Sequence, residues 1–159
     1  MRSRSTLGTV AVLAGGIAAA SLAFAPTAAA VAPGTATATY DCGSWGGGTA
    51  TLTATQSGTA ATITVTSAVT TPIAVGADTI SSTLTLAKGG GGTRVFTGKK
   101  NPALAAGQSV VMGPLSGTVA SGDSLNSYFA GVALKMVIFG VTVNCDAVTS
   151  QSPGPFVFS

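Results

Sequence analysis

The chain contains no histidine and no glutamate, and it has only seven basic and four acidic side chains in 159 residues. Histidine and glutamate are among the commonest general acids and bases, and histidine is the commonest metal ligand. A serine–histidine–aspartate triad is therefore excluded, and two cysteines without histidine make a poor zinc site. The four aspartates are scattered along the chain. The sequence predicts a protein that is not an enzyme, with no catalytic residues, no metal and no cofactor.

The first 30 residues have the three parts of a secretory signal peptide. Arg2 and Arg4 precede an apolar run over residues 7–24, and three alanines at residues 28–30 follow it. We expect cleavage after Ala30, which leaves a domain of residues 31–159 with no transmembrane segment. An uncleaved membrane anchor is the alternative, disfavoured because the run is rich in glycine and alanine. The expected location is extracellular, either free or held non-covalently at the cell surface.

Loss of the leader changes the charge of the chain. The five basic and four acidic side chains of residues 31–159 give a net charge of +1. No basic face of the kind that follows a phosphate backbone remains, so nucleic acid is not an expected partner. A chain of this length forms one domain with a real hydrophobic core.

Cys42 and Cys145 are the two cysteines of the chain, one near each end of the expected domain. An exported protein folds in an oxidising compartment, which favours their pairing. The bridge would close most of the domain into a loop and stabilise it by about 4 to 5 kcal/mol in the chain-entropy model. Two free thiols, or a redox-active pair, are the alternatives.

The expected domain has the two-residue alternation of half-buried β-strands. Threonine alternates with apolar residues at 35–41, 49–56, 60–67 and 80–87, and Ser57-Gly58 marks the turn of the clearest hairpin. Further expected elements are short strands at 93–97, 108–112, 115–119 and 156–158, an edge strand or irregular connection at 70–75, and one helical turn at 103–106. The most apolar stretch, 131–145, is expected to form the central late strand or strands, bent or bulged at Gly140.

Seven to nine short strands separated by turn residues predict an all-β fold. The preferred architecture is an immunoglobulin-like or Greek-key β-sandwich, with a small β-barrel as the alternative. Trp45 lies only three residues after Cys42, so the Cys–Trp–Cys spacing of antibody domains is absent. A short proline-containing tail is expected to add a last edge pairing.

The alanine-rich leader, the aromatic-x-Cys start at residues 40–42 and the Val-x-Cys late strand at residues 143–145 form a recognisable set. With its threonine-rich strands, the chain resembles small exported β-sandwich proteins of actinomycetes that have no assigned activity. Chromophore carriers of the neocarzinostatin type are exported sandwiches of similar size, but they use two disulfides where this chain has cysteines for one. The resemblance implies an exported sandwich and no particular activity.

Residues 122–125 spell the Gly-Asp-Ser-Leu block of the GDSL esterase and lipase family, in which the serine is the nucleophile. That family carries the block near the start of an α/β domain and supplies a histidine near its end. This chain has no histidine, so Ser124 lacks the base that would activate it. The segment is interpreted as a turn in which Asp123 and Ser124 cap local backbone groups.

Recognition and assembly remain as functions. The first hypothesis is a non-catalytic binding protein that presents Trp45, Arg94, Lys99 and Lys100 on loops to an extracellular protein or a glycan. The alternative is a structural surface protein that self-associates through its threonine-rich strands and the apolar run 132–143. An exported protease inhibitor, with residues 98–102 as its loop, or a small-ligand carrier is the lesser alternative. Both hypotheses have a purely structural alternative. Trp45 would then fold over the disulfide, and residues 132–143 would form a buried core strand.

Overall fold

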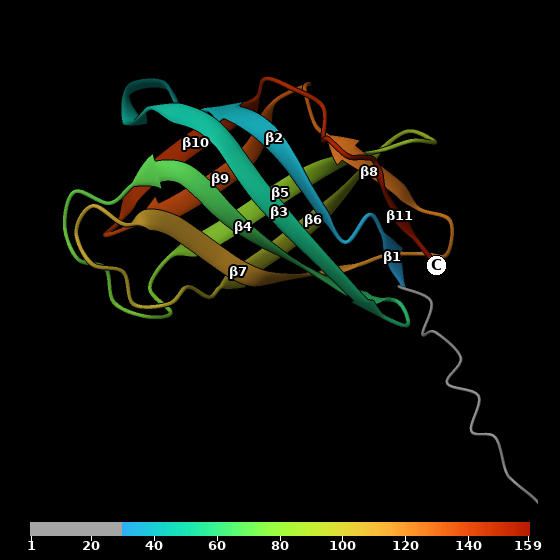
Figure 1. The fold of residues 1–159 in the computed structure, drawn as a ribbon, viewed down its shortest axis with the longest axis horizontal. Helices are drawn as coiled ribbons and strands as arrows, with labels where there is room; N and C mark the ends of the chain where they lie inside the picture. The colour runs from blue at the N-terminus through green and yellow to red at the C-terminus, as the bar shows by residue number, and fades with distance from the viewer. Residues whose placement is uncertain (1–29) are drawn as a thin grey trace, which may run out of the picture.

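The computed structural model describes residues 30–159, which form a closed antiparallel β-barrel of eight strands with three additional short strands (Figure 1). Around the barrel the strands follow the order β5-β6-β7-β4-β3-β2-β10-β9, and β9 pairs with β5 to close the ring. The predicted signal peptide, apart from its last residue, lies outside the described residues.

The barrel strands are β2 (Thr35–Asp41), β3 (Gly47–Ser57), β4 (Ala60–Thr70), β5 (Ser81–Lys88), β6 (Thr93–Lys99), β7 (Ser109–Thr118), β9 (Val132–Ile138) and β10 (Val141–Ala147). The additional strands are β1 (Val31–Ala32), β8 (Ser124–Ser127) and β11 (Phe156–Phe158), and a 3-10 turn, η1, spans Gly43–Trp45.

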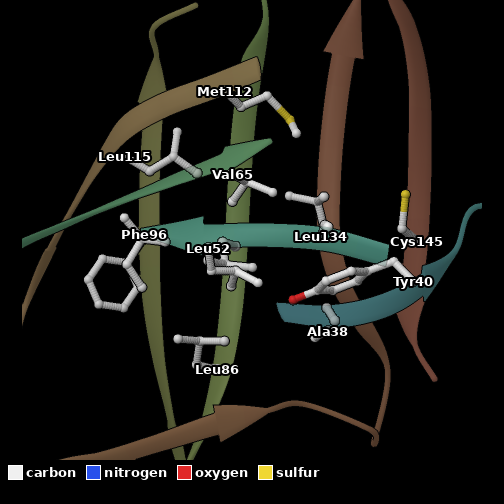
Figure 2. Close-up of a cluster of buried hydrophobic side chains, with 14 of the residues drawn as sticks. Ala38, Tyr40, Leu52, Val65, Leu86, Phe96, Met112, Leu115, Leu134 and Cys145 are labelled. Atoms are coloured by element: carbon white, nitrogen blue, oxygen red, sulfur yellow. The ribbon is translucent and has the colours of Figure 1, made fainter. Parts of the chain in front are cut away.

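The alternation seen in the sequence separates the inside of the barrel from its outside. In β3 the buried residues Ala50, Leu52 and Ala54 alternate with exposed threonines. The outer threonines interact across strands, as where the hydroxyls of Thr55 and Thr62 lie 2.7 Å apart. Apolar side chains from all sides of the barrel meet in the interior (Figure 2). The threonine repeat is thus the solvent face of a barrel wall.

The all-β prediction is confirmed, and the architecture is the barrel that the sequence offered as the alternative, not the sandwich it favoured. A sandwich and a barrel require the same alternation within each strand. They differ in whether the two outermost strands of the sheet pair with each other. In this barrel those strands are β5 and β9, which pair through residues 81–84 and 134–137. That pairing is long-range and leaves no local pattern in the sequence.

Two segments differ from the predicted elements near residues 103–119. No helical turn forms at 103–106, where Leu104 instead makes an isolated bridge with Val75. The two strands expected on either side of Gly113-Pro114 are one bulged strand, β7. Gly113 has φ +119°, and a Cβ there would lie 2.8 Å from the carbonyl oxygen of Ile63. Only glycine fits this bulge, so the residue that appeared to break a strand bends one.

The predicted disulfide is present between Cys42 and Cys145. It joins the end of β2 to β10, two neighbouring strands of the ring that pair at only two positions, Asp41 with Asp146 and Tyr40 with Ala147. By contrast, β2 and β3 pair at seven positions. The chain after β10 continues along β2, where the backbone of Val148 donates to Thr39 and Ser152 and Thr37 donate to each other. The disulfide therefore reinforces a seam whose direct strand pairing is short.

Tyr40 points into the barrel from β2, with its ring among the core side chains (Figure 2). Its hydroxyl has no hydrogen-bond partner among the described residues, and burial raises its pKa from 10.0 to about 12. A raised pKa favours the protonated phenol in the folded state, so its contribution to stability is complete below pH 10 and is lost as the pH rises toward 12.

We therefore expect the free energy of unfolding to fall by about 2 to 3 kcal/mol between pH 10 and pH 12, because one pKa unit corresponds to about 1.4 kcal/mol. Urea denaturation across this range measures the effect. The Tyr40→Phe variant should lose the alkaline dependence and be at least as stable as the wild type at pH 7, since it removes an unpartnered buried hydroxyl. An unchanged alkaline slope in this variant would contradict the assignment to Tyr40.

Candidate binding site

The two ends of the barrel differ. Because the eight strands alternate in direction, four connections meet at one end: residues 42–46, 71–80, 100–108 and 139–140, on the left in Figure 1. We call this the loop end. At the opposite end lie β1, β8 and β11, whose apolar side chains join the core.

The opposite end is filled with apolar side chains. Phe156 and Phe158 of β11 and Leu125 of β8 are almost completely buried, and Val31 of β1 is buried beside them in the same core cluster. These side chains close the barrel with packed hydrocarbon. Within residues 30–159, no strand crosses the loop end in this way.

A cavity of about 240 Å³ opens at the loop end. Its floor consists of four buried residues: Val75 from the 71–80 connection, Val110 from β7, Met136 from β9 and Val143 from β10. Each of the three strand residues points inward by the same alternation that builds the core. The cavity is therefore a part of the barrel interior that the chain itself does not fill.

The rim of the cavity is unusually apolar for exposed residues. Trp45 of η1 is 49% exposed, Ile73 is 56% exposed and Phe139 is 63% exposed, and Val141 stands beside them. The remaining lining comes from Val69, Thr70, Thr71, Pro72 and Ile138. Large exposed apolar side chains gathered around a hollow are typical of an interaction site.

Phe139 has an unfavourable backbone conformation for its residue type. It has φ +52° and the following Gly140 has φ +79°, so both central residues of the β9–β10 turn have positive φ. Such two-residue turns prefer asparagine, aspartate or glycine at the first position. An aromatic residue there costs about 1 kcal/mol and exposes a ring to water. The position is therefore occupied at the expense of stability, as at a functional site.

Asn101 fixes the two longest connections of the loop end to each other. Its side-chain oxygen accepts hydrogen bonds from the backbone N–H groups of Thr79 and Ile80, both at 2.8 Å. Its side-chain nitrogen donates to the carbonyl oxygens of Gly76 and Pro102, both at 2.7 Å. The 71–80 connection, which carries Ile73 and Val75 of the cavity lining, is thus fixed to the 100–108 connection.

None of the thirteen residues that line the cavity is charged. The comparisons with known proteins add nothing to this description. No protein-family model, curated protein or solved structure matches the chain. The candidate site is therefore defined by its geometry alone.

In residues 30–159 no helix is long and apolar enough to cross a bilayer. The same part of the chain contains no group of three histidine, cysteine, aspartate or glutamate residues placed to hold a metal ion.

The structure separates the four residues predicted to form a binding surface. Trp45 lies on the cavity rim, and Lys99 and Lys100 lie at the same end of the barrel but do not line the cavity. The Lys100 ammonium is 3.3 Å from the carboxylate of Asp78. Arg94 is the second residue of β6 and lies at the opposite end. The four residues do not form one surface.

Arg94 belongs to a charge cluster around Asp123, which is 3% exposed. The carboxylate accepts a hydrogen bond from Arg94 Nε at 2.8 Å and from the backbone N–H of Ala120 at 2.9 Å, and Lys88 Nζ lies 3.1 Å away. The contact with Ala120 agrees with the capping role predicted for Asp123. The two basic partners, Lys88 and Arg94, come from β5 and β6, far away in sequence, and no local pattern predicts them.

These partners, Arg94 first, hold the pKa of the Asp123 carboxyl far below its usual value. Because the pKa of Asp123 is lower in the folded than in the unfolded protein, its carboxylate stabilises the fold above the unfolded pKa of about 4. This stabilisation is lost as the pH falls below that value. We expect Asp123→Asn to lose about 1 to 3 kcal/mol at pH 7 and to show a flatter loss of stability below pH 4. Urea denaturation at pH 7 and at pH 3 tests this, and equal acid sensitivity of the two proteins would contradict it.

Sequence reasoning identified Trp45 but missed the rest of the site. Ile73, Phe139 and the four floor residues resemble ordinary strand and loop residues in sequence, and their convergence depends on how the barrel closes. One local signal was present. A Phe-Gly pair at 139–140 between two apolar strands marks a hairpin turn with an aromatic residue where turns rarely place one.

Proposed function

We propose that this protein is a non-catalytic binding protein that holds a small apolar molecule in the cavity at the loop end. The observation that carries the proposal is the cavity of about 240 Å³, which is open at one end of an otherwise filled barrel and rimmed by exposed apolar side chains. Apolar, largely preformed cavities at the mouths of barrels are typical ligand sites. Of the functions that the sequence left open, this is the small-ligand carrier.

Two features of the loop end support this proposal, an unfavourable residue on the rim and an ordered wall. Phe139 adopts a left-handed conformation and exposes its ring, although an asparagine would suit the turn better. Asn101 makes four hydrogen bonds that order the cavity wall. A preorganised apolar site binds more tightly because less freedom is lost on binding.

Self-association through strand edges receives less support. Every strand of the eight-membered ring pairs with a neighbour on both sides, although β6 and β7 pair only at Thr97 and Ser116, so the ring has no fully open edge strand. The apolar run 132–143, which suggested assembly, forms β9, the Phe139-Gly140 turn and the start of β10, with Ala133, Leu134 and Met136 buried. We further propose that the protein works outside the cytoplasm, for which the disulfide is the supporting feature.

Trp45 allows a direct test of the proposal. It is the single tryptophan of the chain and it stands on the cavity rim, so its fluorescence reports on the site. We expect titration with the neutral ten-carbon alcohol 1-decanol to shift the Trp45 emission to shorter wavelength, with saturation at one molecule per protein. A stoichiometry far above one, or no saturation, would argue against a defined site.

The Phe139→Asn variant should change binding and stability in opposite directions. Asparagine tolerates positive φ and suits the turn, so the free energy of unfolding should rise by about 1 kcal/mol. Loss of the rim aromatic should weaken 1-decanol binding by about tenfold. Phe129, also 56% exposed but located between β8 and β9 at the opposite end, provides the matched control. Phe129→Asn should leave the affinity for 1-decanol unchanged, and equal losses in both variants would contradict the site.

A further inference from the structure

We infer that the cavity selects an uncharged, compact ring compound of about ten carbon atoms, such as a bicyclic aromatic alcohol, and rejects ionised molecules of the same size. This inference rests on the proposed function and names the class of ligand. It follows from three properties of the lining, namely its charge, its volume and its capacity for hydrogen bonds.

The first property is the absence of charge in the lining. The thirteen lining residues comprise eleven apolar side chains and two threonines, Thr70 and Thr71. A carboxylate or an ammonium group inside such a cavity would lose its hydration without finding an opposite charge, which costs several kcal/mol. Fatty acids and amines could enter only by leaving their charged group in water at the rim. Neutral ligands carry no such penalty.

The second property is the size of the cavity. An apolar protein cavity of about 150 Å³ stays dry and binds benzene, so by proportion 240 Å³ accommodates about ten carbon atoms. Two fused six-membered rings have this size. The sealed opposite end, with Phe156 and Phe158 buried, prevents a longer molecule from passing deeper into the barrel.

The third property is the small number of polar groups. The Thr71 hydroxyl already donates a hydrogen bond to the carbonyl oxygen of Ala105, at 3.0 Å. Thr70 is exposed on the rim and supplies one further hydroxyl. One polar substituent directed toward the rim can thus be satisfied, whereas several polar groups on the ligand would be buried unpaired. Trp45 and Phe139 on the same rim add aromatic surface for stacking.

A matched series of probes tests this inference on the disulfide-bonded protein at pH 7 by isothermal titration calorimetry. The probes are 2-naphthalenemethanol, 2-naphthoate and 2-naphthylmethylammonium, which share one ring system and differ in charge. A fourth probe, 1-pyrenemethanol, keeps the neutral alcohol and doubles the ring count. We expect 2-naphthalenemethanol to bind one to one, at least about tenfold more tightly than either ion and more tightly than the pyrene alcohol.

A gain-of-function variant extends the test. Val141 lies on the rim and is exposed, so Val141→Lys should fold normally and offer a positive charge to a ligand in the cavity. We expect this variant to bind 2-naphthoate about tenfold more tightly than the wild type does. Val157→Lys, at a comparably exposed valine on β11, is the control and should leave naphthoate binding unchanged.

The outcomes separate the ligand class from the function. Binding of the two ions within threefold of the neutral alcohol, or tighter binding of the pyrene alcohol, overturns the inferred class while leaving a binding protein. Saturable 1-decanol binding without measurable binding of any naphthalene probe also overturns the class alone. Failure of 1-decanol and all four probes overturns the proposed function, and the inference with it.

Discussion

Replacing both cysteines, in Cys42→Ala/Cys145→Ala, is expected to lower the free energy of unfolding by about 4 to 5 kcal/mol. The two residues are separated by 103 positions, so the bridge restricts the unfolded chain over most of its length. In the chain-entropy model the stabilisation grows with the logarithm of the loop length, which makes this a strong bridge. Urea denaturation of the variant and the wild type measures the difference.

The position of the bridge predicts where the weakened protein opens. The bridge joins β2 to β10, which pair directly at only two positions, so the loss of the disulfide should weaken this seam more than the seam between β3 and β4. Hydrogen exchange should accelerate in β2 and β10 more than in β3 and β4, which pair at seven positions. Uniform acceleration across all strands would show that the bridge acts on global stability alone.

Reduction of the wild type with dithiothreitol is the control for lost packing. Both sulfur atoms are buried, so the alanine variant also leaves a small void in the core. Reduction keeps the sulfur atoms and removes only the covalent link. A reduced wild type that is as stable as the oxidised protein would contradict a stabilising role for the bridge.

Much of the wall of the barrel could be predicted from local patterns. The strand expected at residues 35–41 is β2 with identical bounds, and the hairpin around Ser57-Gly58 joins β3 to β4 as expected. The last edge pairing of the tail is confirmed by β11, which pairs with β1 and β8. These features depend on alternation and turn residues, which are properties of neighbouring positions.

The closure of the ring and the cavity could not be predicted in the same way. Both depend on which strands meet, as when β5 pairs with β9 across about fifty residues of sequence. An inward-facing valine such as Val110 or Val143 has the same local pattern whether it packs against a neighbour or borders empty space. The volume left unfilled is a property of the whole barrel.

Asn101 illustrates the limits of local interpretation. It lies in residues 98–102, a segment of glycine, lysine, asparagine and proline that is typical of an exposed turn. Lys99 and Lys100 are indeed exposed, but Asn101 is 4% exposed and all four of its side-chain hydrogen bonds are to backbone groups. The asparagine therefore acts as the fixed centre of the loop end.

We expect Asn101→Ala to lower the free energy of unfolding by about 2 to 4 kcal/mol, because it leaves backbone groups of both connections without partners in a buried position. The 71–80 connection carries Ile73 and Val75, so its loosening should also weaken binding of 2-naphthalenemethanol by about tenfold. Urea denaturation and calorimetry measure the two effects. Asn144→Ala, at an exposed position of β10, should change stability by less than about 0.5 kcal/mol and leave binding intact.

Asn101→Asp distinguishes the two halves of the amide. The carboxylate keeps the acceptor for Thr79 and Ile80 but cannot donate to the carbonyl oxygens of Gly76 and Pro102, which it would face at close range. At pH 7 this variant should therefore be no more stable than Asn101→Ala. Acidification should restore part of the lost stability, since a protonated carboxyl donates one hydrogen bond. If both variants kept wild-type stability, the two connections would be held together by other contacts. If both variants kept wild-type binding of 2-naphthalenemethanol, the cavity would not require an ordered wall.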